Sequence, residues 1–75
     1  MKNFNFTAHI EKDKETGLYT GIVANLPGAH TQAASLDELR NNLEEVITLC
    51  LECMNEEEIN DLPSFVGFQQ LTIAV

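Results

Sequence analysis

Two cysteines and two histidines are the residues of this 75-residue chain best suited to metal or redox chemistry. Cys50 and Cys53 have two residues between them, a spacing at which a thiol pair can chelate zinc or close a redox disulfide. His9 or His30 could complete such a zinc site. Reactive thiol pairs normally lie at a helix N-terminus, where the helix dipole favours the thiolate. Cys50 and Cys53 occur late in a helical pattern and on its apolar side, so they are predicted to pack in the core rather than bind a metal.

The other polar residues offer no recognisable catalytic set. Neither histidine has a nucleophile or a carboxylate partner at a catalytic spacing, and the sequence contains no glycine-rich phosphate loop and no nucleophile elbow. The acidic run from Glu56 to Glu58 lacks the alternating ligands and the central glycine of a calcium loop. It is predicted to be a solvated helical turn. We therefore expect no enzymatic activity, no cofactor and no metal.

The charge balance limits the class of partner. Twelve acidic residues against four basic residues give a formal charge of −8. Nucleic acid and anionic membrane both require a cationic contact surface, so neither is expected as a direct partner. A basic protein partner is favoured, although an acidic surface that only keeps a protein in solution is the commoner explanation.

The sequence also predicts where the chain works and how it is stabilised. The amino terminus has no apolar core of signal-peptide length, and the longest apolar-rich run is interrupted by Thr48 and Glu52. With no disulfide framework, a cytoplasmic location is expected. Residues 1–75 are predicted to form one domain. Because a chain of this size buries only about 60% of the surface that its unfolded form exposes, we expect a homodimer or a higher homo-oligomer.

The segment from Ser35 to Met54 is the longest periodic stretch and predicts one amphipathic helix. Ser35 and Glu38 have the spacing of a capping box. Its apolar arc comprises Leu36, Leu39, Leu43, Val46, Ile47, Cys50, Leu51, Cys53 and Met54, with Leu49 just outside it. The opposite arc comprises Glu38, Asn41, Glu45, Thr48 and Glu52. A single helix cannot bury its own apolar side, so the rest of the chain must supply a second layer.

The segments before this helix are predicted to supply that layer as strands. Alternation predicts strands over Asn3 to Ile10 and Leu18 to Ala24, joined by a charged hairpin turn at Glu11 to Gly17. A turn at Asn25 to Gly28 leads to a short third strand at Ala29 to Gln32.

Two features of the second strand predict its surroundings. Gly21 leaves space for a large neighbour such as Phe6 or Leu43. Leu18 and Ile22 fall on a sheet face that a two-layer domain leaves open, which predicts a contact surface there.

The segments after the helix complete the predicted architecture. The stretch from Asn55 to Asp61 either prolongs the helix or forms a second short helix capped by Asn55, and Pro63 ends either one. Leu71 to Val75 is predicted to be a final strand. The fold class is therefore α+β in two layers, an antiparallel β-sheet with one long helix packed on one face, in the order β-β-β-α-β.

One set of motifs resembles a known family. The segment Leu26 to Gln32 (LPGAHTQ), followed by Ser35 to Glu38 (SLDE) and then Asn42 and Glu45, is similar to the core signature of the HicB-like antitoxins. The likeness extends to Tyr19 and to the closing strand, and so covers essentially the whole chain. The sequence departs from that signature at Ala24, Ala29, Ala33 and Ala34, which affects the expected geometry of the turn.

The resemblance implies a partial RNase H-like fold and a role as the antitoxin of a toxin–antitoxin pair. The implied partner is a small basic HicA-type toxin that cleaves messenger RNA with a histidine, and the antitoxin would mask its active surface. Longer members carry a DNA-binding domain, which is not expected here. No motif of the family identifies the contact residues. From the acidic face of the predicted helix and the charged hairpin turn, the expected partner-binding residues are Glu38, Glu45 and Glu52, with Glu11 and Asp13 as a second cluster.

Two other functions remain open from the sequence. A free-standing oligomeric interaction or scaffold module would use the open sheet face for self-association and would have no toxin partner. A metal-binding or catalytic protein would hold zinc in stoichiometric amount.

Overall fold

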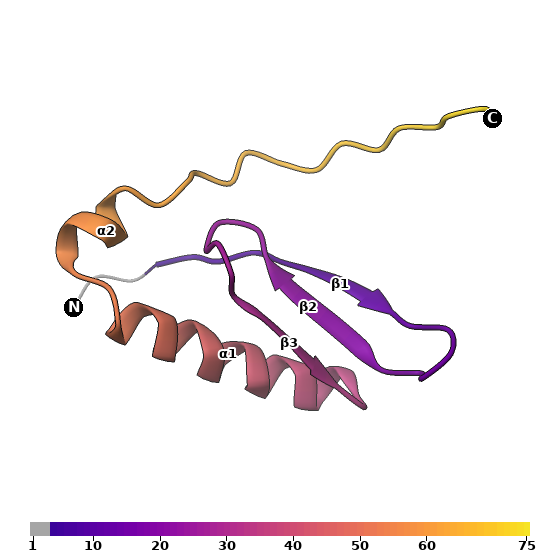
Figure 1. Cartoon of the computed structure of the whole chain (residues 1–75), viewed down its shortest axis with the longest axis horizontal. Helices are drawn as coiled ribbons and strands as arrows, with labels where there is room; N and C mark the ends of the chain where they lie inside the picture. The colour runs from indigo at the N-terminus through magenta and orange to yellow at the C-terminus, as the bar shows by residue number, and fades with distance from the viewer. Residues whose placement is uncertain (1–3) are drawn as a thin grey trace.

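The computed structural model describes residues 4–75 and contains a three-stranded sheet followed by two helices (Figure 1). The elements are β1 (Ala8–Lys12), β2 (Tyr19–Val23), β3 (His30–Ala33), α1 (Leu36–Glu52) and α2 (Glu56–Asn60). The sheet is antiparallel with its strands in sequential order. Helix α1 packs on one face, over β3 and β2. The predicted two-layer α+β fold is confirmed.

Two tight turns fix the register of the sheet. In the β1–β2 turn, the Asp13 N–H donates to the Leu18 carbonyl at 2.9 Å and the Asp13 carbonyl accepts from the Gly17 N–H at 2.8 Å. In the β2–β3 turn, the Val23 N–H donates to the Ala29 carbonyl at 2.9 Å. Gly17 and Gly28 have φ of 73° and 83°, in the left-handed region that glycine adopts without steric cost. The predicted turns are therefore present, with β3 one residue later than expected.

The core lies between α1 and the two strands that it covers. Its buried members are Val23, Leu26, Ala29, Ala33, Leu39 and Leu43. Gly21 lies at the centre of the sheet, opposite Ile10 on one side and Thr31 on the other. A Cβ atom at Gly21 would lie 3.0 Å from both Leu43 δ-carbons, so the missing side chain lets α1 approach the sheet. The large neighbour predicted for Gly21 is Leu43.

Helix α1 is shorter and less buried than its sequence pattern predicts. It ends at Glu52, with Ser35 as its N-cap, and Ser35 Oγ accepts from the Glu38 N–H at 3.2 Å. Of the predicted apolar arc, Leu36 and Cys53 are exposed, because they lie at the two ends of the helix. A complete capping box forms in residues 4–75 at α2 instead, between Asn55 and Glu58. The stretch after α1 is thus a second helix.

The first strand differs from its prediction at both ends. It begins at Ala8 and continues to Lys12, whereas Asn3, the predicted start, lies outside the described residues. Residues 4–7 run beside the β2–β3 turn, where the Asn25 side chain bonds to the Asn5 carbonyl and the Thr7 N–H. They form no strand because β2, the neighbour with which they would pair, ends at Val23.

The predicted final strand at Leu71 to Val75 does not pair with any strand of residues 4–75. The chain beyond Pro63 is extended and runs along the β1 side of the sheet before projecting away from the domain (Figure 1). The element order within this chain is therefore β-β-β-α-α, and the closing β-strand was wrong as an element of the isolated chain. An extended segment becomes a strand only when a neighbouring edge accepts its hydrogen bonds.

We expect Leu39→Ala to destabilise the protein by about 2–5 kcal/mol, because Leu39 is fully buried and its loss leaves a cavity between α1 and the sheet. Leu49→Ala is the matched control, since Leu49 lies on the same helix and is 53% exposed. It should cost about 0.5 kcal/mol or less. Urea unfolding followed by circular dichroism measures both, and equal losses would contradict this placement of the helix.

Candidate functional site

Three of the predicted partner-binding residues form one row on α1. Glu38, Glu45 and Glu52 are exposed on the side of the helix away from the sheet. They follow one another at intervals of seven residues, about two helical turns, so consecutive carboxylates are separated by roughly 10 Å along the axis. We call these three residues the acidic row. It matches the solvent-facing arc predicted from the sequence.

The other two predicted residues lie in different surroundings. Glu11 Oε1 lies 3.0 Å from His9 Nε2 on the exposed face of β1. The Asp13 carboxylate accepts from the Glu15 N–H at 3.0 Å and from the Thr16 hydroxyl at 3.1 Å. Asp13 therefore builds the hairpin turn. Because Lys12 and Lys14 flank Asp13, the hairpin has little net charge and does not extend the negative field of the acidic row.

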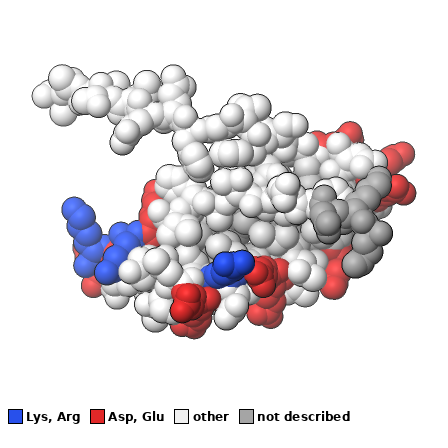
Figure 2. All heavy atoms as spheres, turned by 180° about the vertical axis from the view of Figure 1, so that it is seen from behind, with Lys and Arg blue, Asp and Glu red and all other residues white. Residues whose placement is uncertain are grey.

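Negative charge is concentrated on the helical layer. Nine of the twelve acidic residues, and one basic residue, lie between Asp37 and Asp61. Figure 2 shows acidic side chains along the helical side of the molecule, with basic side chains gathered at the hairpin end and a single basic group interrupting the red surface. A cationic partner would therefore be attracted mainly to the helices.

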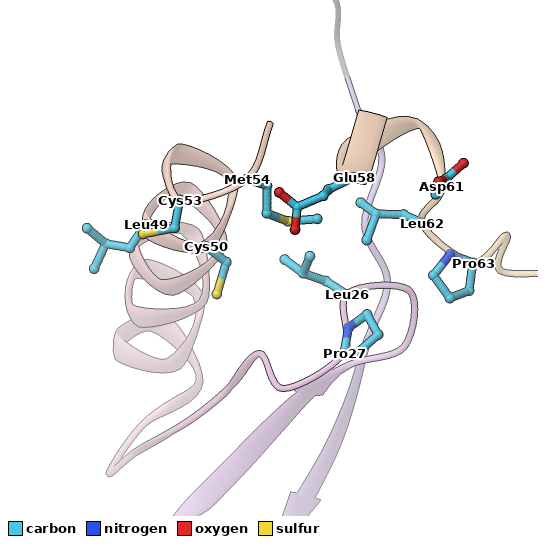
Figure 3. Close-up of a pocket in the computed structure, with 10 residues that line it drawn as sticks. All are labelled: Leu26, Pro27, Leu49, Cys50, Cys53, Met54, Glu58, Asp61, Leu62 and Pro63. Atoms are coloured by element: carbon cyan, nitrogen blue, oxygen red, sulfur yellow. The ribbon is translucent and has the colours of Figure 1, made fainter. Parts of the chain in front are cut away.

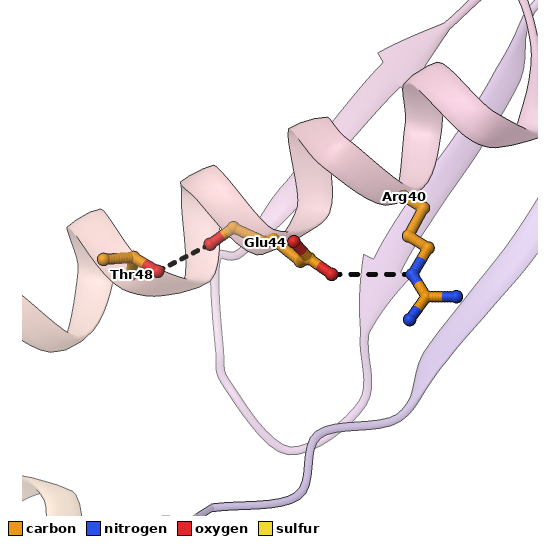
Figure 4. A network of polar contacts seen from close by, with 3 residues as sticks. All are labelled: Arg40, Glu44 and Thr48. Atoms are coloured by element: carbon orange, nitrogen blue, oxygen red, sulfur yellow. Dashed lines mark hydrogen bonds and ion pairs between the residues drawn. The ribbon is translucent and has the colours of Figure 1, made fainter.

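The basic group on α1 is Arg40, and it is already engaged with a neighbour. Arg40 Nε lies 3.5 Å from Glu44 Oε1, and the Glu44 carbonyl accepts from the Thr48 hydroxyl at 2.7 Å (Figure 4). Both charged side chains are largely exposed, so this pair, one turn apart, adds only a few tenths of a kcal/mol at most. Arg40 therefore offsets the charge of Glu44 and makes no ion pair with the acidic row within the described residues.

A pocket of about 710 Å³ opens where α1 ends, between α2 and the β2–β3 turn (Figure 3). Its lining comprises Leu26, Pro27, Leu49, Cys50, Cys53, Met54, Glu58, Asp61, Leu62 and Pro63. Leu26 lies between Met54 and Pro27 in this view, and Cys50 lies on the α1 side of the pocket. Sequence reasoning missed this pocket, because its walls come from a turn, a helix end and a second helix that only the folded chain brings together.

The chemistry of the pocket is that of an apolar recess with an acidic margin. Its walls are aliphatic, sulfur-containing and proline side chains, and its two ionisable oxygen groups belong to Glu58 and Asp61. Glu58 is held by its capping box, where its Oε1 accepts from the Asn55 N–H at 3.0 Å. Such a recess suits an apolar side chain of a protein or peptide in which a neighbouring residue is a lysine or arginine.

The cysteines and histidines are distributed without a common centre. Cys50 is half-buried against the core, as predicted, but Cys53 is exposed, because α1 ends there and no sheet lies beneath it. His9 and His30 both lie on the open sheet face, one on each side of Ile22. Within residues 4–75, no group of three or more histidine, cysteine, aspartate or glutamate side chains is placed to hold a metal ion.

These features define a class of protein: a small α+β domain whose single long helix shields one sheet face and carries an acidic outer side. Neither helix that the structure describes combines the length and the apolar content that crossing a bilayer requires.

Comparisons with known proteins assign the chain to a family. It is 45% identical over 75 residues to a UPF0150 protein of Thermotoga maritima, covering 97% of each chain. It is 38% identical over 73 residues to a UPF0150 protein of Synechocystis, covering 97% of this chain and all of that one. A UPF0150 protein of Archaeoglobus fulgidus is 44% identical over 68 residues, with 91% and 93% coverage. The chain belongs to the UPF0150 family. No family model and no solved structure matches it.

The exposure of the two thiols predicts different reactivity. Cys53 should react with a disulfide reagent about tenfold or more faster than Cys50, which is half-buried. Stopped-flow absorbance should resolve two phases of one thiol each. Cys53→Ser should remove the fast phase and Cys50→Ser the slow phase. A fast phase that survives Cys53→Ser would show that the end of α1 is placed incorrectly.

Proposed function

We propose that this protein is a cytoplasmic antitoxin of the HicB type, which binds a small basic RNA-cleaving toxin and masks its active surface. The observation that supports this proposal best is the acidic row Glu38, Glu45 and Glu52 on the exposed side of α1. The resemblance of the turn and helix-start motifs to HicB-like antitoxins supplies the partner class. In this role the chain inhibits by contact and performs no catalysis itself.

Electrostatics explains how such a chain would recognise its partner. A toxin that cleaves RNA needs a cationic surface to hold the phosphate backbone. A row of carboxylates spanning roughly 20 Å along α1, three charges at two-turn intervals, can occupy that surface in place of RNA. Complementary charge of this kind accelerates association and selects the partner. Exposed ion pairs contribute less to the lifetime of the complex.

Apolar contact is also needed for a long-lived complex, because exposed ion pairs alone are weak. The pocket beside α2 provides it at the end of the same helix. An apolar toxin side chain in this recess, next to a lysine or arginine facing Glu58 or Asp61, would anchor one end of an interface that continues along the acidic row.

The charge hypothesis has a direct test with a charge-matched control. The triple variant Glu38→Lys, Glu45→Lys and Glu52→Lys should weaken binding by about tenfold to a hundredfold. The probe is the small basic histidine-containing protein that we expect the adjacent gene to encode. Affinity is measured by titration calorimetry between 50 and 500 mM salt. The slope of the logarithm of the affinity against the logarithm of the salt concentration should also become shallower, by on the order of one counterion per lost contact.

The control makes the same change in net charge elsewhere. Glu15→Lys, Glu56→Lys and Glu57→Lys are all exposed positions outside the acidic row, and their side chains make no hydrogen bond within the described residues. This variant should bind within about threefold of the wild type at physiological salt. Equal loss in both variants would indicate a net-charge effect, and unchanged affinity in the acidic-row variant would remove the proposed interface.

A free-standing oligomeric interaction module is the second candidate, favoured by the large apolar side chains that remain exposed in the single chain. The two functions differ in an inexpensive observation. The antitoxin requires a neighbouring gene for a short basic protein and co-purification with its product, and an interaction module requires neither.

A further inference from the structure

The last twelve residues, 64–75, form an exposed apolar arm, which we call the tail. Every residue in it is exposed, with Phe68 at 69%, Leu71 at 73% and Ile73 at 76%. It contains no charged residue, although the whole chain carries −8. Figures 1 and 2 show it projecting from the domain as an uncharged extension. Folded domains rarely leave such a segment uncovered. An uncharged segment rich in β-branched and aromatic residues and without proline readily adds to a sheet edge.

The end of the tail extends past the edge of the sheet in its own chain, so that sheet cannot cover it. The tail runs in the same direction as β1, and the Phe68 ring lies 6.4 Å from the His9 ring. Each extended residue advances about 3.3 Å, so a parallel tail brings Leu71 level with Lys12, the last residue of β1. Leu71 to Val75 would then lie beyond the strand, beside the charged hairpin turn. Their burial needs another surface.

The sheet meanwhile has an unused edge at β1. The Thr7 carbonyl accepts from the Ala24 N–H, and the Asp13 N–H donates to the Leu18 carbonyl. Since hydrogen-bonded pairs alternate along an antiparallel ladder, the odd-numbered residues of β1 bond to β2. Ala8, Ile10 and Lys12 therefore direct their backbone groups to the free edge. Ile10 is also 50% exposed, because α1 packs over β3 and β2.

We propose that two copies of this chain exchange their tails, each adding Leu71 to Val75 as a strand to the free β1 edge of the other. The donated segment and β1 are both five residues long. Each copy has one uncovered extended segment and one unpaired sheet edge. In a two-fold arrangement, each edge pairs with the segment of the other copy, and the assembly is closed. Because side chains alternate between the two faces of a strand, Leu71, Ile73 and Val75 lie on the same face of the added strand, next to Ile10.

Charge supports a second copy at this location. Two chains of −8 repel one another over most of their surface, and the repulsion is strongest where the helices face each other. The tail carries no charge. The edge that it would contact is β1, at the opposite side of the sheet from β3, and α1 packs mainly over β3. This inference is independent of the proposed antitoxin function, since it needs no toxin.

Sedimentation equilibrium of the intact chain tests the exchange. The wild type should be a dimer at micromolar concentration. Ile73→Asp should raise the dimer dissociation constant at least a hundredfold, because it places a charge on the buried face of the added strand. Thr72→Asp carries the same charge on the other face and should change it less than fivefold. A wild type that is monomeric at 1 mM, or a dimer unaffected by Ile73→Asp, would overturn the proposal.

The receiving edge is tested separately. Ile10→Pro removes an N–H that points to the free edge and leaves the β1–β2 hydrogen bonds intact, whereas Ile10→Ala removes only the side chain. The proline variant should be monomeric and the alanine variant mainly dimeric, with circular dichroism confirming that both are folded. Mixing Ile10→Pro with Ile73→Asp should restore part of the dimer, since one partner keeps an intact tail and the other an intact edge. No recovery on mixing would rule out tail exchange at β1.

Discussion

The contact between Leu43 and Gly21 is the interaction on which the rest of this structure depends. Because Gly21 has no side chain, α1 lies close to β2, and Leu39 is fully buried beside it. A helix about 10 Å across can shield only part of a sheet whose strands are spaced by about 4.8 Å. Here it covers β3 and β2, and β1 keeps an open edge and an exposed Ile10. A close fit on one side of the domain thus leaves the other side incomplete.

The same helix separates two kinds of surface. Its inner side is apolar and contributes to stability, while its outer side carries the acidic row, whose three residues are exposed. Charges there cost little folding energy, since exposed carboxylates remain solvated. The outer side can therefore carry an excess of negative charge. This explains how a domain of 75 residues carries −8 without burying an unpaired charge, and no buried charged side chain occurs among the described residues.

Much of this fold could be predicted from periodicity, but the limits have physical causes. The 3.6-residue pattern predicted α1, and the glycine turns predicted the hairpins. Periodicity predicts that Leu36 and Cys53 face the core, because it shows on which side of a helix a residue lies. It does not show how far the sheet extends beneath the helix, and these two residues lie beyond the sheet. Leu71 to Val75 has the composition of a strand, but pairing depends on an edge that sequence alone does not locate. The carboxylates were found as exposed groups, while the role of Asp13 in its turn and the pocket beside α2 depend on tertiary geometry.

The two surfaces proposed here can operate at the same time because they lie on different parts of the fold. An added strand at β1 extends the sheet away from β3, and α1 remains accessible on its outer side. A two-fold dimer then carries two acidic rows, each on its own helix. If a toxin binds one row, the second row is free for another toxin, and binding to both needs no rearrangement of the exchanged tails. Self-association would supply the stability that a single small core lacks, and the acidic helix would supply recognition.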